Sequence, residues 1–115
     1  MHLYVEMWKA RPAWLAMEPD ERAAFLARLE PMVMKLVDEG MQLIGFAVTD
    51  ADVPHGAADY PYMSVWRMPT LDLVRAYEQA VEATGWHEYF DQTNTRGSVQ
   101  TAAALLEHMT RAQQP

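Results

Sequence analysis

The sequence predicts an α+β domain with a four-stranded antiparallel sheet, two helices on one face and a further helix after the last strand. Two segments, residues 2–9 and 59–69, alternate along the chain and are rich in aromatic and β-branched side chains, as strands are. Two others, residues 19–39 and 70–84, carry apolar residues at spacings of three and four, as amphipathic helices do. Half of the 115 residues are apolar and 22% are charged, which is typical of a globular protein.

The first predicted strand, residues 2–9, has two unlike faces, because successive side chains of a strand point to opposite sides. The apolar face carries Leu3, Val5 and Met7. The aromatic and polar face carries His2, Tyr4, Glu6 and Trp8. The connection that follows, residues 10–17, is too apolar for a solvated loop, and we expect Trp14 and Leu15 to fold back as a flap or short turn.

The first predicted helix begins at Pro19, because proline suits the first helical position. Asp20 and Glu21 complement the positive end of the helix dipole. Pro31 lies inside the apolar pattern and is expected to kink or divide the helix, since it cannot donate a backbone hydrogen bond. Gly40 is placed to end the helix in a left-handed conformation.

Residues 41–48 form the second predicted strand, in which Gly45 indicates a bulge or a close approach of other atoms. Alternation places Leu43, Gly45 and Ala47 opposite Ile44, Phe46 and Val48. Residues 49–59 contain three aspartates, Pro54, His55 and Gly56 and have no periodicity. This segment is predicted to be a loop.

The third predicted strand, residues 59–69, is the one around which the rest of the chain is arranged. One of its faces carries Tyr62, Ser64, Trp66 and Met68, and the other carries Met63, Val65 and Arg67. Both faces hold large apolar groups, so neither is expected to face water alone. Thr70 then caps the second helix, which Gly85 ends.

The fourth strand is predicted over residues 89–96 and ends at Gly97. Ser98 is placed to cap a short last helix, and His108 on that helix is expected to be exposed. The order of strands and helices is that of the ferredoxin-like sandwich, whose first and third strands are central neighbours.

In this sandwich we expect the apolar strand faces, with Leu3, Val5, Met7, Met63 and Val65, to lie beneath the helices. The aromatic and polar faces would then lie on the opposite side of the sheet. Two helices cannot cover both sides, so the uncovered face needs a partner. A second copy of the chain, related by two-fold symmetry, is the simplest partner.

Two segments, residues 62–69 (YMSVWRMP) and 85–97 (GWHEYFDQTNTRG), resemble the dimeric α+β barrel superfamily. The segment PAWLAM at residues 12–17, together with residues 20–22, is similar to darcynin-like and related uncharacterised bacterial domains. The resemblance covers nearly the whole chain and implies a homodimeric α/β barrel whose sheets face each other. Members of the superfamily include cofactor-free monooxygenases, lactone isomerases, haem-degrading enzymes and proteins without a known activity, so the resemblance implies the fold more than the function.

Composition narrows the function classes. The chain has no cysteine, which excludes disulfides, thiolate nucleophiles and cysteine-ligated metals. A net charge of −7 argues against binding to nucleic acid or to an anionic membrane surface. Neither a signal peptide nor a membrane-spanning segment is recognisable, so we expect a cytoplasmic protein with a single domain over residues 1–115.

Glu6 and His55 are the candidate catalytic residues. Glu6 shares its strand face with Tyr4 and Trp8, and a buried glutamate there could serve as a general base. The alternative is that Glu6 reaches solvent or pairs with an arginine across the dimer. His55 could act as an acid–base group on a loop over a cavity, or could simply belong to a solvated loop.

The candidate ligand-binding residues are Tyr4, Trp8, Tyr62, Ser64 and Trp66, which would form an aromatic wall with hydrogen-bonding groups. The same residues would also suit a dimer interface, and the sequence leaves both interpretations open. The aspartates near His55 fit no established ligand spacing, so no metal site is predicted. No cofactor is expected, because the chain has no phosphate-binding loop or dinucleotide motif and no histidine stands out as a haem ligand.

These observations predict a homodimer that binds a small apolar or aromatic molecule in a pocket beside the sheet. By resemblance, its chemistry would be cofactor-free oxygenation or isomerisation, with Glu6 or His55 moving the proton. The alternative is a non-catalytic interaction module whose aromatic face is dimer core.

Overall fold

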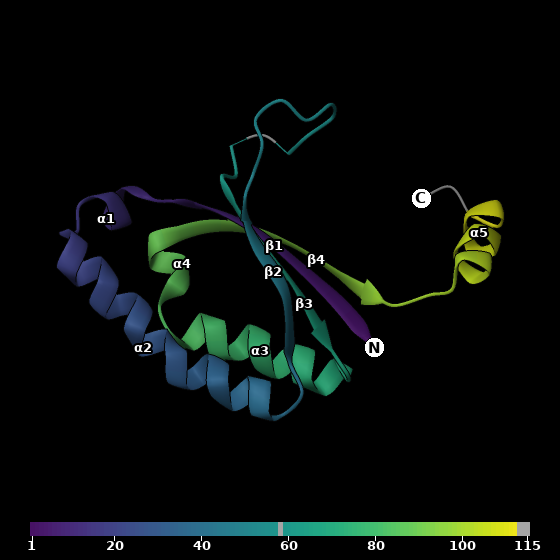
Figure 1. Cartoon of the computed structure of the whole chain (residues 1–115), viewed down its shortest axis with the longest axis horizontal. Helices are drawn as coiled ribbons and strands as arrows, with labels where there is room; N and C mark the ends of the chain where they lie inside the picture. Colours follow the sequence, from purple (N-terminus) through teal and green to yellow (C-terminus); the bar gives the residue numbers. More distant parts are fainter. Residues whose placement is uncertain (58, 113–115) are drawn as a thin grey trace.

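A computed structural model describes residues 1–57 and 59–112, and its elements follow the predicted order (Figure 1). All strand pairs are antiparallel, in the order β2-β3-β1-β4. The strands are β1 (His2–Ala10), β2 (Gln42–Val48), β3 (Tyr62–Met68) and β4 (Phe90–Ser98). The helices are α1 (Pro12–Leu15), α2 (Pro19–Asp38), α3 (Leu71–Ala83), α4 (Trp86–Tyr89) and α5 (Ala102–Thr110). The α+β fold that the sequence predicts is confirmed.

Helix α3 begins and ends where the sequence indicates. The hydroxyl of Thr70 accepts a hydrogen bond from the backbone N–H of Leu73 at 3.1 Å, which satisfies one of the free donors of the first turn. Gly85 follows the helix with a φ of 82°, a left-handed conformation that glycine adopts without strain. Pro31 was expected to kink or divide the first helix. Division is wrong, since α2 runs through Pro31 from Pro19 to Asp38, and a kink stays a prediction.

Strand β2 contains the irregularity that Gly45 indicated, and this changes which side chains share a face. A register shift lies between Leu43 and Gly45, so that Leu43 pairs with Trp66 and Phe46 with Ser64. Leu43 and Phe46 therefore share the face of the sheet that carries Ser64 and Trp66. The simple alternation expected for this strand is wrong because a bulge adds one residue to one strand of a pair.

The fourth strand extends beyond the predicted end, because β4 continues through Gly97 to Ser98. Thr101, rather than Ser98, caps the last helix, and its hydroxyl accepts a hydrogen bond from the N–H of Ala104 at 3.1 Å. Ser98 cannot cap this helix because it is still in the strand, paired with His2.

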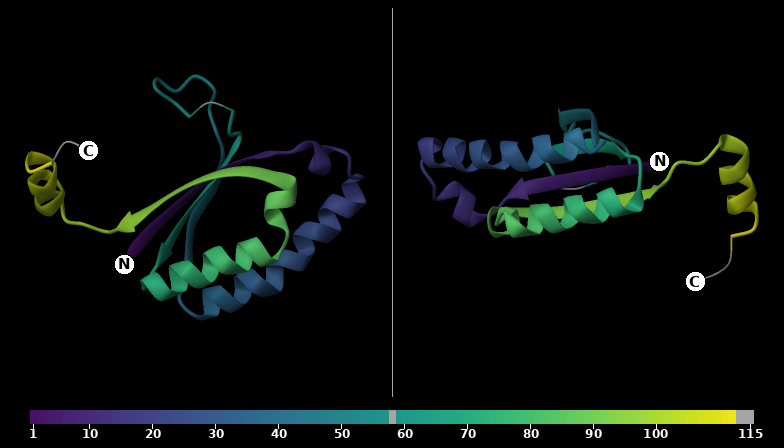
Figure 2. Two further views of the ribbon diagram at one scale, coloured as in Figure 1. Left: turned by 180° about the vertical axis from the view of Figure 1, so that it is seen from behind. Right: turned by 90° about the horizontal axis from the view of Figure 1, so that it is seen from below.

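The aromatic and polar strand faces lie beneath α2 and α3, and the opposite expectation is wrong. The exposed fraction is 2% for Tyr4, 5% for Glu6, 1% for Ser64 and 4% for Trp66, whereas Leu3 is 40% exposed. Both long helices lie on the same side of the sheet (Figures 1 and 2). The physical reason is that large aromatic side chains bury the most apolar area, while their polar atoms find partners in one another and in α3.

The other face of the sheet and the last helix remain without a covering layer among the described residues. That face carries Leu3, Val5, Met7, Met63 and Val65. Helix α5 stands apart beyond the end of β4, and none of its residues is buried (Figures 1 and 2). The radius of gyration is 16.5 Å, against about 13 Å expected for a compact chain of this length. No helix of the described residues is both long and apolar enough to cross a membrane.

Candidate functional site

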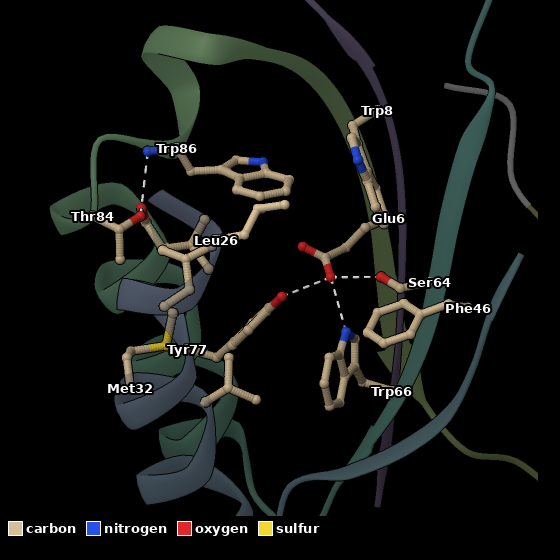
Figure 3. A pocket seen from close by; sticks show the side chains of 13 residues that line it. Glu6, Trp8, Leu26, Met32, Phe46, Ser64, Trp66, Tyr77, Thr84 and Trp86 are labelled. Atoms are coloured by element: carbon tan, nitrogen blue, oxygen red, sulfur yellow. Dashed lines mark hydrogen bonds between the residues drawn. The ribbon is translucent and has the colours of Figure 1, made fainter. Parts of the chain in front are cut away.

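A cavity of about 260 Å³ lies between the sheet and the helices (Figure 3). One wall is aliphatic and comes from α2, with Leu26, Leu29, Met32 and Val33. The other walls are largely aromatic, with Trp8, Phe46, Trp66, Tyr77 and Trp86. Of the described residues that line this mostly apolar space, Glu6 is the one with a carboxylate side chain.

The carboxylate of Glu6 is held by four hydrogen bonds. Its Oε1 atom accepts from Ser64 Oγ at 2.8 Å, from Trp66 Nε1 at 2.9 Å and from Tyr77 Oη at 2.7 Å. Its Oε2 atom accepts from Gln92 Nε2 at 2.8 Å. Buried carboxylates are costly to desolvate, and these donors compensate that cost.

The sheet register explains why these groups meet. Glu6 lies opposite Ser64 on β3 and opposite Asn94 on β4. Trp66 is two residues after Ser64 and therefore points to the same face. Tyr77 comes from the buried side of α3, which packs over β1 and β3.

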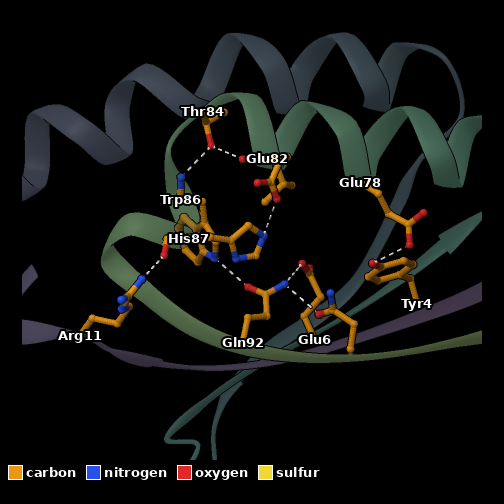
Figure 4. Close-up of polar contacts among 11 residues, drawn as sticks. Tyr4, Glu6, Arg11, Glu78, Glu82, Thr84, Trp86, His87 and Gln92 are labelled. Atoms are coloured by element: carbon orange, nitrogen blue, oxygen red, sulfur yellow. Dashed lines mark hydrogen bonds and ion pairs between the residues drawn. The ribbon is translucent and has the colours of Figure 1, made fainter. Parts of the chain in front are cut away.

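Gln92 links the carboxylate to α4. Its Oε1 atom accepts from Trp86 Nε1 at 2.6 Å, and its Nε2 atom donates to both Glu6 Oε2 and Asn94 Oδ1 at 2.8 Å (Figure 4). Both amide hydrogens and the amide oxygen are engaged, so the orientation of this side chain is fixed by its partners. Trp86 is thereby held against the cavity.

Among the described residues, no cation forms an ion pair with Glu6. The ion pairs within residues 1–57 and 59–112 join other residues: Arg11 with Asp91, His87 with Glu82, Arg96 with Glu78, and Arg111 with Glu107. Glu6 is therefore a buried carboxylate held by neutral donors alone, at the wall of a cavity.

Two tyrosines near Glu6 are held in their neutral, donating form. Burial raises the pKa of Tyr77 far above its usual range, and the charge of Glu6 and the hydrogen bond to it add to this effect. Burial also raises the pKa of Tyr4, with a further contribution from its hydrogen bond to Glu78 at 3.0 Å. Tyr77 therefore remains a donor to Glu6 throughout the ordinary pH range.

A second, polar cavity of about 190 Å³ lies next to the first. Its lining includes Tyr4, Glu78, Glu82, His87, Gln92 and Asn94 (Figure 4). Glu6 and Tyr77 line both cavities, so the carboxylate lies in the wall between an apolar space and a polar one. No cluster of three or more metal-ligating side chains occurs in the part of the chain that the structure describes.

The chain belongs to DUF6616, a family of unknown function. The model of this family matches residues 1–112. No match was found among the curated proteins.

A solved structure shows the same type of fold. A candidate chlorite dismutase, TA0507, is 13% identical with a TM-score of 0.70; the match covers 94% of this chain and 48% of that protein. This chain thus spans about half of that protein's length. The likeness supports the ferredoxin-like fold. Membership of the dimeric α+β barrel superfamily and the resemblance to darcynin-like domains stay predictions.

Two further structures match with lower TM-scores. The 5-chloro-2-hydroxyhydroquinone dehydrochlorinase TftG of Burkholderia phenoliruptrix AC1100, solved with 2,5-dihydroxybenzoquinone, is 18% identical with a TM-score of 0.44, and the match covers 90% of this chain and 98% of that one. Protein SP2199 of Streptococcus pneumoniae is 13% identical with a TM-score of 0.42, and the match covers 96% of this chain and all of that one, 100%.

The structure brings together four of the residues proposed from the sequence. Glu6, Trp8, Ser64 and Trp66 line the apolar cavity. Tyr4 lines the polar cavity instead.

The other two lie outside both cavities. Tyr62 is 41% exposed and packs beside Trp8, with ring centroids 6.0 Å apart. His55 is exposed in the loop between β2 and β3, where its φ is 56°.

The sequence did not identify Tyr77, Trp86, Gln92 or the cavity wall formed by α2 as parts of the site. Tyr77 was recognisable as part of the apolar stripe of its helix. Its partnership with Glu6 could not be recognised, because the aromatic strand faces were expected on the side of the sheet away from the helices. Trp86 and Gln92 lie in a dense aromatic and polar segment, which was the available signal.

Proposed function

We propose that this protein binds a small, flat, largely apolar molecule in the cavity between the sheet and the helices. The observation that carries the proposal is a buried carboxylate, without an ion-pair partner in the described part of the chain, that lines an apolar cavity of about 260 Å³. Ligand cavities are typically apolar with a few placed polar groups, and about 300 Å³ is the lower end of their range. A molecule with a single ring fits this size.

Glu6 is the group in this site that is suited to proton transfer. Ser64, Trp66 and Tyr77 hold Oε1, so Oε2 is the oxygen that would accept a hydrogen bond or a proton from the ligand. The reaction class proposed by analogy with the superfamily is cofactor-free oxygenation or isomerisation that begins with such a proton transfer. His55 has no part in this proposal, because it lines neither cavity.

We propose that the protein is a homodimer. The open sheet face carries five apolar side chains of β1 and β3, and α5 exposes Leu105, Leu106 and Met109 by 51%, 62% and 62%. Apolar surfaces of this kind mark interfaces, and a second copy supplies both surfaces at once through two-fold symmetry. Helix α5 follows β4, and the strands β4 and β2 form opposite edges of the sheet. This position favours contact of α5 with a partner subunit over contact with β2 of its own chain.

The test of binding combines native mass spectrometry with a cavity-filling variant. Protein purified without added ligand is expected to be a dimer with a small adduct that denaturation removes. Leu29→Trp fills the cavity from α2 without altering a Glu6 partner, so it should retain the dimer and lose the adduct. If the adduct persists in Leu29→Trp, the ligand is bound elsewhere and the proposed site is wrong.

One observation favours a second candidate, a non-catalytic module in which Glu6 has a purely structural role. The carboxylate already has four donors within the chain and so is satisfied without a ligand. In that case Glu6→Gln should lower stability and leave small-molecule binding unchanged. The binding proposal expects Glu6→Gln to lower affinity even when the variant is folded and dimeric.

A further inference from the structure

We propose that the molecule bound in the apolar cavity carries a cationic hydrogen-bond donor, an amine or ammonium group on a flat apolar body, which binds Glu6 Oε2. This inference rests on the proposed function, because it names the class of ligand for the same cavity.

The first support is the state of the donors around the cavity. Six lining side chains carry an N–H or O–H group, and five of these groups donate within the protein. The five are Ser64, Trp66, Tyr77, Thr84 and Trp86. Only the indole N–H of Trp8 has no hydrogen-bond partner among the described residues. A ligand with several acceptors would therefore leave most of them unsatisfied in an apolar space.

The second support is the unequal use of the two carboxylate oxygens. Oε1 of Glu6 accepts three hydrogen bonds, whereas Oε2 accepts one, from Gln92. An ionised carboxylate has about four acceptor sites on its two oxygens, so the free capacity lies on Oε2. Figure 3 shows this oxygen directed toward the space between Trp86 and Tyr77. The site therefore has an acceptor to offer to a ligand and suits a ligand that donates a hydrogen bond.

The third support is charge. The four donors to Glu6 are neutral groups, whereas the carboxylates beside the neighbouring polar cavity, Glu78 and Glu82, are paired with Arg96 and His87. The protein as a whole carries a net charge of −7. An anionic ligand would be repelled, while a cation gains both a charge-assisted hydrogen bond and the attraction of aromatic rings for positive charge. Trp8, Trp66, Tyr77 and Trp86 supply those rings.

The experiment compares probes of nearly equal shape on the wild-type dimer by isothermal titration calorimetry at neutral pH. Benzylamine is the cationic donor, benzyl alcohol the neutral donor, benzoate the anion and toluene the apolar body alone. We expect benzylamine to bind at least roughly tenfold more tightly than benzyl alcohol, as a charged hydrogen bond exceeds a neutral one by about 1.4 kcal/mol or more. Quenching of tryptophan fluorescence provides a second readout, because three of the four tryptophans line the cavity.

Two charge variants test whether Glu6 is responsible for the preference for a cationic ligand. Glu6→Gln should abolish the preference for benzylamine over benzyl alcohol. Glu107→Gln changes the net charge equally but lies on α5 and should keep the preference. The comparison of probes on the wild type tests the preference for a cation even if Glu6→Gln does not fold. Leu29→Trp should lose the binding of every probe.

The outcomes separate the two levels of the argument. Benzyl alcohol, benzoate or toluene could bind as tightly as benzylamine or more tightly, with this binding lost in Leu29→Trp. That result overturns the cationic ligand and leaves the proposed binding function in place. Binding of no probe at millimolar concentration, together with the absence of a native adduct, overturns both.

Discussion

Replacing Tyr77 by phenylalanine tests whether the hydrogen bonds to Glu6 hold the core together. Tyr77 is 6% exposed, and its phenol donates to Glu6 Oε1 at 2.7 Å. The substitution removes one oxygen atom and keeps the ring, so its edge-on contact with Tyr4, at a centroid distance of 5.6 Å, persists. The carboxylate then keeps three of its four donors.

A hydrogen bond to a charged group contributes about 1.5–3 kcal/mol to stability. Tyr77→Phe should therefore lower the free energy of unfolding by roughly 2 kcal/mol, less any contribution from water that reaches Oε1. The assay is urea unfolding followed by circular dichroism, at one protein concentration for all variants, because the stability of the proposed dimer would depend on concentration. The slope of the unfolding free energy with urea should not change.

Tyr62→Phe is the matched control. It removes the same atom from a tyrosine that is 41% exposed and is expected to change stability by less than about 0.5 kcal/mol. A Tyr77→Phe variant as stable as this control would refute the reasoning, since it would mean that Glu6 does not depend on the phenol.

Three further predictions follow from other parts of the chain. Because the pKa values of Tyr4 and Tyr77 are raised in the fold, both should stay protonated when ordinary tyrosines ionise near pH 10.0. Their contribution to the free energy of unfolding is then fully present below that pH and falls as the pH rises above it. Absorbance at 295 nm follows the ionisation, and urea midpoints follow the stability. Thr70→Ala removes the cap of α3 and should cost about 1 kcal/mol in the same unfolding assay, whereas Thr70→Ser should cost little. Leu106→Gln, on the exposed apolar side of α5, should shift the proposed dimer toward monomer in light scattering with little change in the circular dichroism spectrum. An unchanged mass would exclude α5 from the proposed interface.

The order of elements could be predicted because its signals are local. Alternation in residues 2–9 and 62–68, the cap at Thr70 and the left-handed stop at Gly85 each depend on a few neighbouring residues. The bulge near Gly45 was indicated as well, although its effect on the side-chain register was not. Pro31 does not divide α2, because a helix that is packed along one side can continue past one missing hydrogen bond.

The side of the sheet on which the site lies could not be predicted from alternation. A strand pattern separates two faces but does not say which one a helix covers. Both faces of β3 carry large apolar groups, so hydrophobicity alone did not decide between them. The hydrogen bonds of Glu6 decide which face the helices cover. Glu6 can be buried only where Ser64, Trp66 and Tyr77, a donor from α3, surround it. That condition depends on three separate segments meeting in space.

The position of Glu6 also bears on the choice between a structural and a ligand-binding role. A carboxylate in an apolar core is costly, and well-packed hydrophobic residues often replace buried charges without loss of stability. A purely structural core at this place would be expected to close around the carboxylate, yet a cavity of about 260 Å³ adjoins it. Cavities beside packed side chains are themselves destabilising.

The two costs occur at the same point of the fold, and a bound molecule would offset both by filling the space and by donating to Oε2. A ligand that does so should raise the unfolding free energy of the wild type, and it should do this less in Glu6→Gln and not at all in Leu29→Trp. Equal stabilisation of all three proteins would show that the molecule binds outside the cavity, and Glu6 would then have only its structural role.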